Sequence, residues 1–219
     1  TLNLFLTCPR KYYYTKIAGI KPAKGVVKEL GTKQGNSVHS ALFEYYTSEF
    51  YKQNNTFDLA VFKEMLAKQN LTPLELEIWS QKFKEYEIYE NARFRAGFRV
   101  LECEKEVQSE FCGVKIKGFI DRIDADANGD VLILDYKTGE ANINSLQLAF
   151  YEALYGGEVR SAYYALKNEP SLVSSKKSIE DLNGEIEKLK GINKTKINFE
   201  RKSSACAFCE YATLCRREL

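Results

Sequence analysis

Residues 114–137 read VKIKGFIDRIDADANGDVLILDYK, and this stretch contains a predicted hairpin together with several acidic residues. Apolar residues alternate with polar ones on both sides of its centre, as at Val114 and Ile116 and again at Val131 and Ile133. A period of two is typical of β-strands, and the central DANGD segment is rich in residues that form tight turns. The stretch therefore predicts two antiparallel strands joined by a short loop.

Asp135 and Lys137 lie two positions apart in the second strand, so their side chains project from the same face. The length of the loop decides whether Asp121 joins them. A two-residue loop would put the two acids on opposite faces, whereas a three-residue loop, with Gly129 as its left-handed residue, would pair Asp121 with Asp135. We expect the three-residue loop, because directly opposed Cβ atoms lie about 4.5–5.5 Å apart, close enough for both carboxylates to bind one hard cation.

Carboxylates held together on the face of a sheet are costly unless something neutralises them, and a divalent cation is the usual remedy. In the alternative interpretation, Asp121 pairs with Arg122 or another base, and Asp135 and Lys137 form a surface salt bridge. The hairpin alone leaves both interpretations open.

Helical patterns flank the hairpin. Apolar residues have helical spacing in residues 32–51, 57–69 and 74–95 before it and in residues 145–155 and 179–189 after it. Residues 159–166 resemble a strand, and the polar residues 168–180 predict a surface loop. Helices, an antiparallel sheet, a crossover helix and a further strand predict an α/β or α+β fold.

Four cysteines form a second pattern, because three lie near the end of the chain and one near its start: Cys206, Cys209, Cys215 and Cys8. Thiolates in close array bind soft metal centres, so we expect a metal or iron–sulfur site that ties the two ends together. A zinc knuckle and buried free thiols are the alternatives. Both ends are rich in Lys and Arg, so closing this site would concentrate positive charge that the net charge of +2 conceals. Such a basic patch is typical of proteins that bind nucleic acid.

Composition and missing motifs exclude several classes. The chain has 219 residues, of which 44% are apolar and 28% charged, and no run of 18 apolar residues predicts a membrane span. Six cysteines without a signal-like start favour a reducing, cytoplasmic location. The chain has neither a phosphate-binding loop nor a Gly-x-Ser-x-Gly elbow, and a serine triad would have to use its only histidine, His39. Because it begins at Thr1 and holds a single Met, we expect a piece of a longer protein.

Six short motifs occur in one order along residues 4–217, and each is weak alone: the Cys8-Pro-Arg-Lys-Tyr opening, His39, Gly118-x-x-Asp121, Asp135-Tyr-Lys137, Gln147-x-x-x-Tyr151 and the Cys206-x-x-Cys209-x(5)-Cys215 ending. In this order they resemble the RecB-type branch of the PD-(D/E)xK nuclease superfamily. The cysteine motifs at the two ends are similar to those of members that carry a [4Fe-4S] cluster, namely AddB-type helicase–nuclease subunits and CRISPR adaptation nucleases.

The resemblance implies a restriction-endonuclease-like fold, with a central mixed sheet flanked by helices. It implies a helical subdomain in residues 1–97, a nuclease core in residues 98–199 and a cysteine-rich segment in residues 200–219 that packs back on the N-terminus.

The resemblance also implies roles for individual residues. His39, Asp121 and Asp135 would bind Mg²⁺ or Mn²⁺ together with the carbonyl oxygen of Tyr136. Lys137 would position the attacking water and stabilise charge on the phosphate. Gln147, Tyr151 and Glu104 would border the site, with Glu104 preferred to Glu106 as the acid on the preceding strand. Cys8, Cys206, Cys209 and Cys215 would hold a [4Fe-4S] cluster or, alternatively, zinc.

We therefore expect a metal-dependent DNA exonuclease domain that hydrolyses phosphodiester bonds. By resemblance, it would belong to a bacterial recombination and double-strand-break-repair enzyme, with a helicase motor in the same chain or complex. The alternatives are a free-standing RecB-family nuclease, a non-catalytic module that binds DNA ends and is stapled by an iron–sulfur cluster, and a zinc-only scaffold protein.

Overall fold

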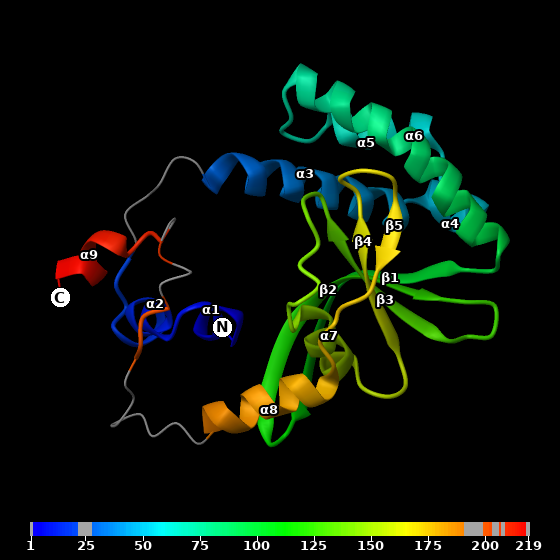
Figure 1. Cartoon of the computed structure of the whole chain (residues 1–219). Helices are drawn as coiled ribbons and strands as arrows, with labels where there is room; N and C mark the ends of the chain where they lie inside the picture. The colour runs from blue at the N-terminus through cyan, green and yellow to red at the C-terminus, as the bar shows by residue number, and fades with distance from the viewer. Residues whose placement is uncertain (1, 22–27, 191–198, 203–205, 207–208, 218–219) are drawn as a thin grey trace. The chain divides into compact units, whose positions relative to one another are not determined.

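The computed structural model describes residues 2–21, 28–190, 199–202, 206 and 209–217, which form two compact units (Figure 1). The larger unit is Gly31–Ile186, and the smaller combines the two ends of the chain, Thr1–Leu30 and Glu187–Leu219. Among the described helices, none is both long and apolar enough to cross a membrane.

The larger unit is built on a five-stranded mixed sheet. Its strands lie side by side in chain order: β1 (Arg99–Phe111), β2 (Val114–Ala125), β3 (Val131–Lys137), β4 (Arg160–Ala165) and β5 (Ser171–Val173). β1, β2 and β3 are antiparallel neighbours, β4 runs parallel to β3, and β5 runs antiparallel to β4. The expected mixed sheet flanked by helices is confirmed. The predicted loop of residues 168–180 is wrong where β5 lies, because a strand of three residues is too short to show an alternating pattern.

The helices of this unit follow the predicted order with one break. They are α3 (Lys28–Thr47), α4 (Glu49–Asn54), α5 (Leu59–Ala67), α6 (Pro73–Arg95), α7 (Gln147–Tyr155) and α8 (Ile179–Lys190), of which α3 and α8 extend past the unit's boundaries. The helix predicted over residues 32–51 is divided at Ser48, whose extended backbone (ψ 153°) and hydroxyl cap the start of α4. Serine favours this position because its side chain accepts a hydrogen bond from a backbone N–H of the first turn.

The register of β2 with β3 is that of the predicted three-residue loop, residues 127–129, with Asp126 opposite Asp130. Arg122 lies opposite Leu134 and Ala125 opposite Val131, and this register, continued, places Asp121 opposite Asp135. Asp126 N donates to Asp130 O at 3.0 Å across the mouth of the loop. Gly129 has φ +89°, a conformation that residues with a Cβ rarely adopt.

Replacing Gly129 with alanine should lower the free energy of unfolding by about 1–2 kcal/mol, because the cost of positive φ falls on any residue with a Cβ. No heavy atom lies within 4 Å of the Cβ that would be added, so the loss would come from the backbone alone. Gly139→Ala is the matched control, since Gly139 also has open space around it but no positive φ. Urea unfolding would measure both variants. Equal losses in the two would contradict the assigned loop conformation.

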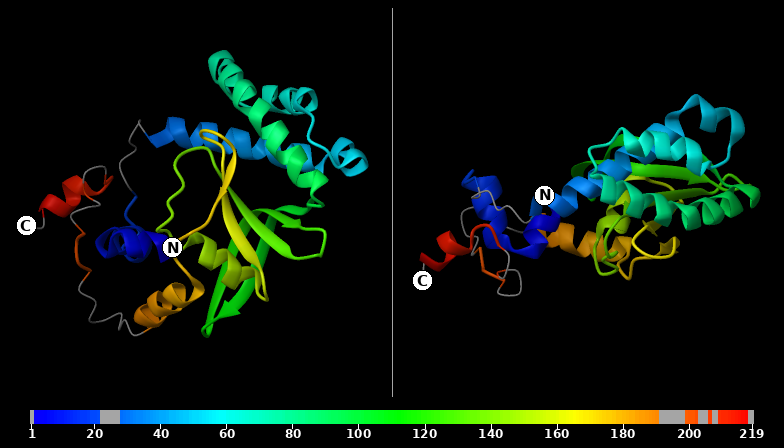
Figure 2. Two further views of the ribbon diagram at one scale, coloured as in Figure 1. Left: turned by 45° about the vertical axis from the view of Figure 1, so that its right-hand side comes forward. Right: turned by 90° about the horizontal axis from the view of Figure 1, so that it is seen from above.

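The sheet has a hydrophobic core on each face. On one face, Leu132, Leu134 and Tyr136 of β3 pack with residues of α3, α5 and α6. On the other face, Ile133 packs with Leu148 and other residues of α7. Figures 1 and 2 show α3 to α6 on one side of the sheet and α7 on the other. β3 is therefore covered on both faces, which explains its continuous apolar sequence before Asp135.

A buried ionic network lies in the core beneath α3 and α6. The side chain of Arg122 is fully buried, and its guanidinium binds Asp124 at 2.6 Å and Glu90 at 2.5 Å. Arg93 binds the same two acids, and the hydroxyls of Tyr46 and Tyr164 donate to Glu90. The alternative in which Asp121 pairs with Arg122 is therefore wrong, because Arg122 is committed to other acids.

The smaller unit brings the two ends of the chain together. It contains α1 (Leu2–Thr7), α2 (Pro9–Tyr12), the π-helical turn η1 (Tyr13–Ile17) and α9 (Ala212–Arg217). Lys11 Nζ lies 2.7 Å from Glu210 Oε2, and the rings of Tyr14 and Tyr211 are 5.5 Å apart. Lys202 Nζ donates to Leu6 O at 2.6 Å. These contacts place Cys8 and the C-terminal cysteines in one structural unit.

Candidate functional site

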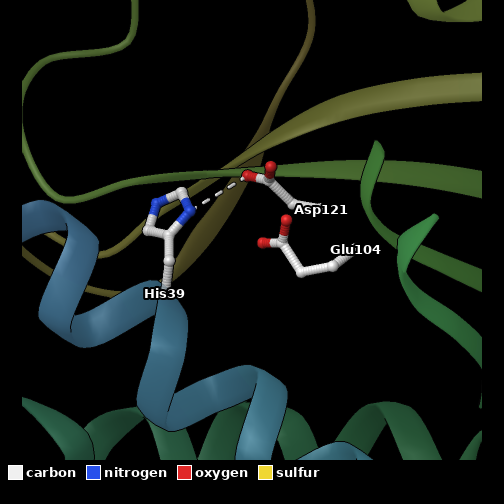
Figure 3. A group of neighbouring side chains, drawn as sticks. All are labelled: His39, Glu104 and Asp121. Carbon is white, nitrogen blue, oxygen red and sulfur yellow. Dashed lines mark ion pairs between the residues drawn. The ribbon is translucent and has the colours of Figure 1, made fainter. Parts of the chain in front are cut away.

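Three potential metal ligands converge in the larger unit. One ligand atom each of His39 on α3, Glu104 on β1 and Asp121 on β2 lie within 4.8 Å of one another. Figure 3 shows the three side chains pointing toward a common space. One imidazole nitrogen and two carboxylates form a donor set that suits a divalent cation.

The register of β1 with β2 places the carboxylates of Glu104 and Asp121 on adjacent strands. Cys103 lies opposite Arg122 and Lys105 opposite Ile120, so Glu104 lies opposite Asp121. With Asp135 across the other edge of β2, three acids occupy adjacent positions on three neighbouring strands.

Glu104 has an unusual backbone conformation, with φ +48°. Cys103 packs with the core beneath α3 and α6, whereas Val107 packs with the core beneath α7. Glu104 therefore lies at the point along β1 where the inward side chains stop packing in one core and begin to pack in the other. Backbone strain of this kind persists only where the surrounding structure stabilises it, and it is common at functional sites.

α3 brings His39 over the end of β3. Its Nδ1 lies 3.4 Å from Asp121 Oδ2, and its Nε2 lies 3.1 Å from the carbonyl oxygen of Tyr136. One turn earlier, a Cβ on Gly35 would lie 3.1 Å from Thr138 Oγ1, so a glycine lets the helix approach closely. Burial lowers the pKa of His39, which keeps the imidazole neutral and able to bind a cation.

A second group surrounds Asp135, which is almost completely buried. Its Oδ1 accepts hydrogen bonds from Gln147 Nε2 at 2.8 Å and from the Tyr151 hydroxyl at 3.1 Å. Lys137 Nζ lies 2.5 Å from Asp135 Oδ2 and donates to Gln147 Oε1 at 2.9 Å. The acid–lysine pair and the two α7 residues named from sequence therefore form one connected cluster.

The carboxylates of the two groups interact. Burial, followed by the charge of Asp135, raises the pKa of Asp121 to about 7, and the same two causes raise the pKa of Glu104. Asp135 Oδ2 accepts no hydrogen bond with good geometry among the described residues, in spite of its ion pair with Lys137. A buried oxygen without a hydrogen bond and mutually repelling acids fit a site for a cation, which would relieve both costs.

The four cysteines named from sequence line one pocket of the smaller unit. Cys8 is buried, and Cys206, Cys209 and Cys215 are partly exposed. Arg10, Lys11, Tyr14 and Arg201 are among the other lining residues. No three of these four sulfur atoms lie within 4.8 Å of one another.

Tyr163 is a neighbour of the site that sequence reasoning missed. It lies opposite Asp135 on β4, and Lys137 Nζ is 5.1 Å from the centre of its ring. A cation over the face of an aromatic ring is attracted to it, so Tyr163 helps to hold Lys137 in place. Its position inside the predicted strand of residues 159–166 gave no signal, because only the parallel pairing of β3 with β4 places the ring there.

The chain is similar to a known protein family and to several solved structures. The family model of the PD-(D/E)XK nuclease superfamily matches residues 1–216. Among solved structures, a candidate exonuclease from Eubacterium rectale is similar with a TM-score of 0.52 and 16% identity, over 94% of this chain and 80% of that one. The protein SSO0001 has a TM-score of 0.36 and 18% identity, over 89% of this chain and 98% of that one. None of the curated protein sequences matches the chain. Because the family model extends over almost the whole sequence, the chain belongs to the PD-(D/E)XK nuclease superfamily.

Proposed function

We propose that this chain is a metal-dependent deoxyribonuclease that hydrolyses phosphodiester bonds at DNA ends. The observation that carries the proposal is the convergence of His39, Glu104 and Asp121 beside the Asp135–Lys137 pair. The family match supports nuclease chemistry, and the likeness to a candidate exonuclease favours action at ends.

The proposed cation is Mg²⁺ or Mn²⁺, because carboxylate oxygens with one imidazole suit these ions. His39, Glu104 and Asp121 would hold it, with Asp135 and the Tyr136 carbonyl next to them. When bound, such a cation lowers the pKa of a coordinated water and neutralises charge that develops on the phosphate.

The protein's own groups would orient the reactants. Lys137 would donate a hydrogen bond to the attacking water or to a phosphate oxygen, and Asp135 and Gln147 hold its ammonium group in place. Tyr151 and Gln147 hold Asp135 in turn. Fixed donors aimed at developing charge supply a large share of the rate in such reactions.

Two glutamates on one strand allow a matched test. Glu104→Gln should reduce Mn²⁺ affinity and lower the cleavage rate of end-labelled single-stranded DNA by about 10²-fold or more, because a ligand charge is lost. Glu106→Gln should leave both nearly unchanged, because Glu106 is exposed and paired with Lys117. Assays with Mg²⁺, Mn²⁺ and EDTA would measure the rates, and calorimetry the affinity. If wild-type protein does not cleave DNA with either ion, or the two variants behave alike, the proposal is wrong.

We also propose that Cys8, Cys206, Cys209 and Cys215 hold a [4Fe-4S] cluster. The four cysteines line one pocket of the smaller unit, and their motifs resemble those of nuclease family members that carry such a cluster. Its role would be to join the two ends of the chain, which already meet through Lys11 and Glu210.

Cys8→Ala should then lose iron and reduce thermal stability and DNA affinity together, because the cluster is held by residues from both ends and Arg10 and Lys11 lie beside it. Cys112→Ala is the control, since Cys112 is a partly exposed thiol at the β1–β2 turn, outside this pocket. Metal analysis of protein purified without oxygen, with melting curves, would decide. Zinc in place of iron would refute the cluster, and unchanged melting and affinity in Cys8→Ala would refute its structural role.

The wider setting that we propose is a helicase–nuclease of bacterial recombination, in which a motor delivers the strand. The resemblance of the cysteine motifs at both ends to those of AddB-type subunits supports it. Co-purification of the native protein with an ATP-dependent DNA helicase, or one continuous chain containing both, would test it.

A further inference from the structure

Two phenylalanines next to the metal-binding residues leave much of their rings exposed. Phe119 on β2 is 53% exposed, and Phe43 on α3 is 41% exposed. Other aromatic rings of the same unit pack closely together, as those of Phe62 and Phe83 do at 4.3 Å. Exposed rings of this size are informative when they lie next to a functional site.

Phe119 faces away from α7. A Cβ on Gly118 would touch Phe150 and Leu154 of α7, and Ile120 is buried in the same core, so the residue between them projects from the opposite face. Phe119 precedes Asp121 by two residues, which is about 6.6 Å along a strand. Its ring is therefore exposed immediately before a metal-binding carboxylate.

Phe43 follows His39 by one helical turn. Residues four apart share a face of a helix and are separated by about 6 Å along its axis. Val38 and Leu42 of α3 pack in the core that contains Leu134, on the sheet face opposite α7. Both phenylalanines therefore lie on the side of the sheet away from α7, Phe43 four residues after His39 and Phe119 two residues before Asp121.

Charge around Phe119 does not favour simple phosphate binding. The neighbouring cation on its strand face, Lys117, is paired with Glu106, which lies opposite Phe119. Glu104 is exposed close by. A nucleic acid would therefore contact the apolar surface of the Phe119 ring on this face. Any base can stack on an aromatic ring.

We propose that Phe43 and Phe119 stack on unpaired bases of the DNA strand whose phosphate lies at the His39, Glu104 and Asp121 centre. The inference rests on the proposed nuclease function and narrows its substrate to strands with unpaired bases at the point of cleavage. In a duplex the faces of the bases are already covered by their neighbours, so only an unpaired segment gains from these rings.

The experiment compares Phe119→Ala and Phe43→Ala with wild-type protein on a single-stranded oligonucleotide and on the same strand with abasic positions around the cleaved bond. For the intact strand, KM should rise about five- to hundredfold in each variant, as expected for the loss of one stacked base. Wild-type protein should prefer the intact strand to the abasic one, and each variant should show a smaller preference. Phe119→Trp should restore the preference for the intact strand.

Ile88→Ala is the matched control, because Ile88 is 70% exposed on α6 and should leave both KM values unchanged. Melting curves would show that the variants keep their fold. If wild-type protein cleaves the intact and abasic strands equally well, or if the Phe variants lose the same factor on both strands, the stacking role is wrong while the nuclease function stands. If wild-type protein cleaves no strand with Mg²⁺ or Mn²⁺, the nuclease function itself is wrong.

Discussion

Lys137→Met is expected to lower the cleavage rate of single-stranded DNA by about 10²- to 10³-fold or more. The ammonium group of Lys137 is held by Asp135 and Gln147 beside the metal-binding residues, where it can stabilise charge that develops in the transition state. Loss of one such preorganised donor costs a factor of this size. Methionine keeps most of the length and apolar surface of the side chain, so packing near Tyr163 should be preserved.

DNA binding should change by less than about tenfold, because affinity for nucleic acid comes from many phosphate contacts, of which one is lost. Fluorescence anisotropy in EDTA would measure binding, and single-turnover cleavage with Mg²⁺ would measure the chemical step. Lys84→Met provides the control, since Lys84 is exposed on α6. Equal losses of binding and cleavage would instead indicate that Lys137 supports the fold or the binding of substrate.

Arg122→Met should lower the free energy of unfolding by about 3–5 kcal/mol. Glu90 and Asp124 are fully buried, and each would lose its ion pair with Arg122 in a region that water does not reach. The two buried acids would then share the charge of Arg93, and removing one cation from a buried ionic network is far more costly than losing a surface pair. Each kcal/mol corresponds to about 2–4 °C in a unit of this size, so the melting temperature should fall by about 6–20 °C.

Arg160→Met is the control for this network. The side chain of Arg160 is 63% exposed in its ion pair with Asp126 at 3.2 Å, and the loss of this pair should cost no more than about 1 kcal/mol. If Arg122→Met does not accumulate as folded protein, Glu90→Gln keeps the shape of the network and should show a smaller loss of the same sign. A melting temperature that is unchanged in Glu90→Gln and Arg122→Met would mean that the network contributes no stability.

The hairpin of β2 and β3 shows what local sequence signals could predict and what they left open. Its period of two and its Asn-Gly turn are local signals, and they predicted both strands. The loop length was a choice between two registers that differ by one residue, and such a slip turns every side chain to the opposite face. The structure has the register that buries Leu134 and Tyr136 beneath α3 and α6 and Ile133 beneath α7. The packing of β3 against helices that are distant in the sequence therefore decides that Asp121 lies opposite Asp135.

Glu90 and Glu104 show what local sequence could not reveal. Glu90 lies in a helix rich in charged residues and looks like part of a solvated face, yet Arg122 and Arg93 hold it in the core. Glu104 and Glu106 occupy equivalent positions in an alternating strand. Only Glu104, with its left-handed backbone, lies beside His39 and Asp121.

Local sequence patterns were enough to predict the hairpin, the main helices, an acid–lysine pair two residues apart and four thiols at the two ends of the chain. These follow from short-range periodicity and from side-chain type, which each segment carries wherever it folds. Which of these groups contact one another depends on long-range packing. His39 reaches Asp121 because α3 crosses the end of β3, where Gly35 allows close approach, and Tyr163 lies under Lys137 because β4 pairs in parallel with β3. Such contacts depend on the packing of whole elements, and packing is a property of the folded chain as a whole.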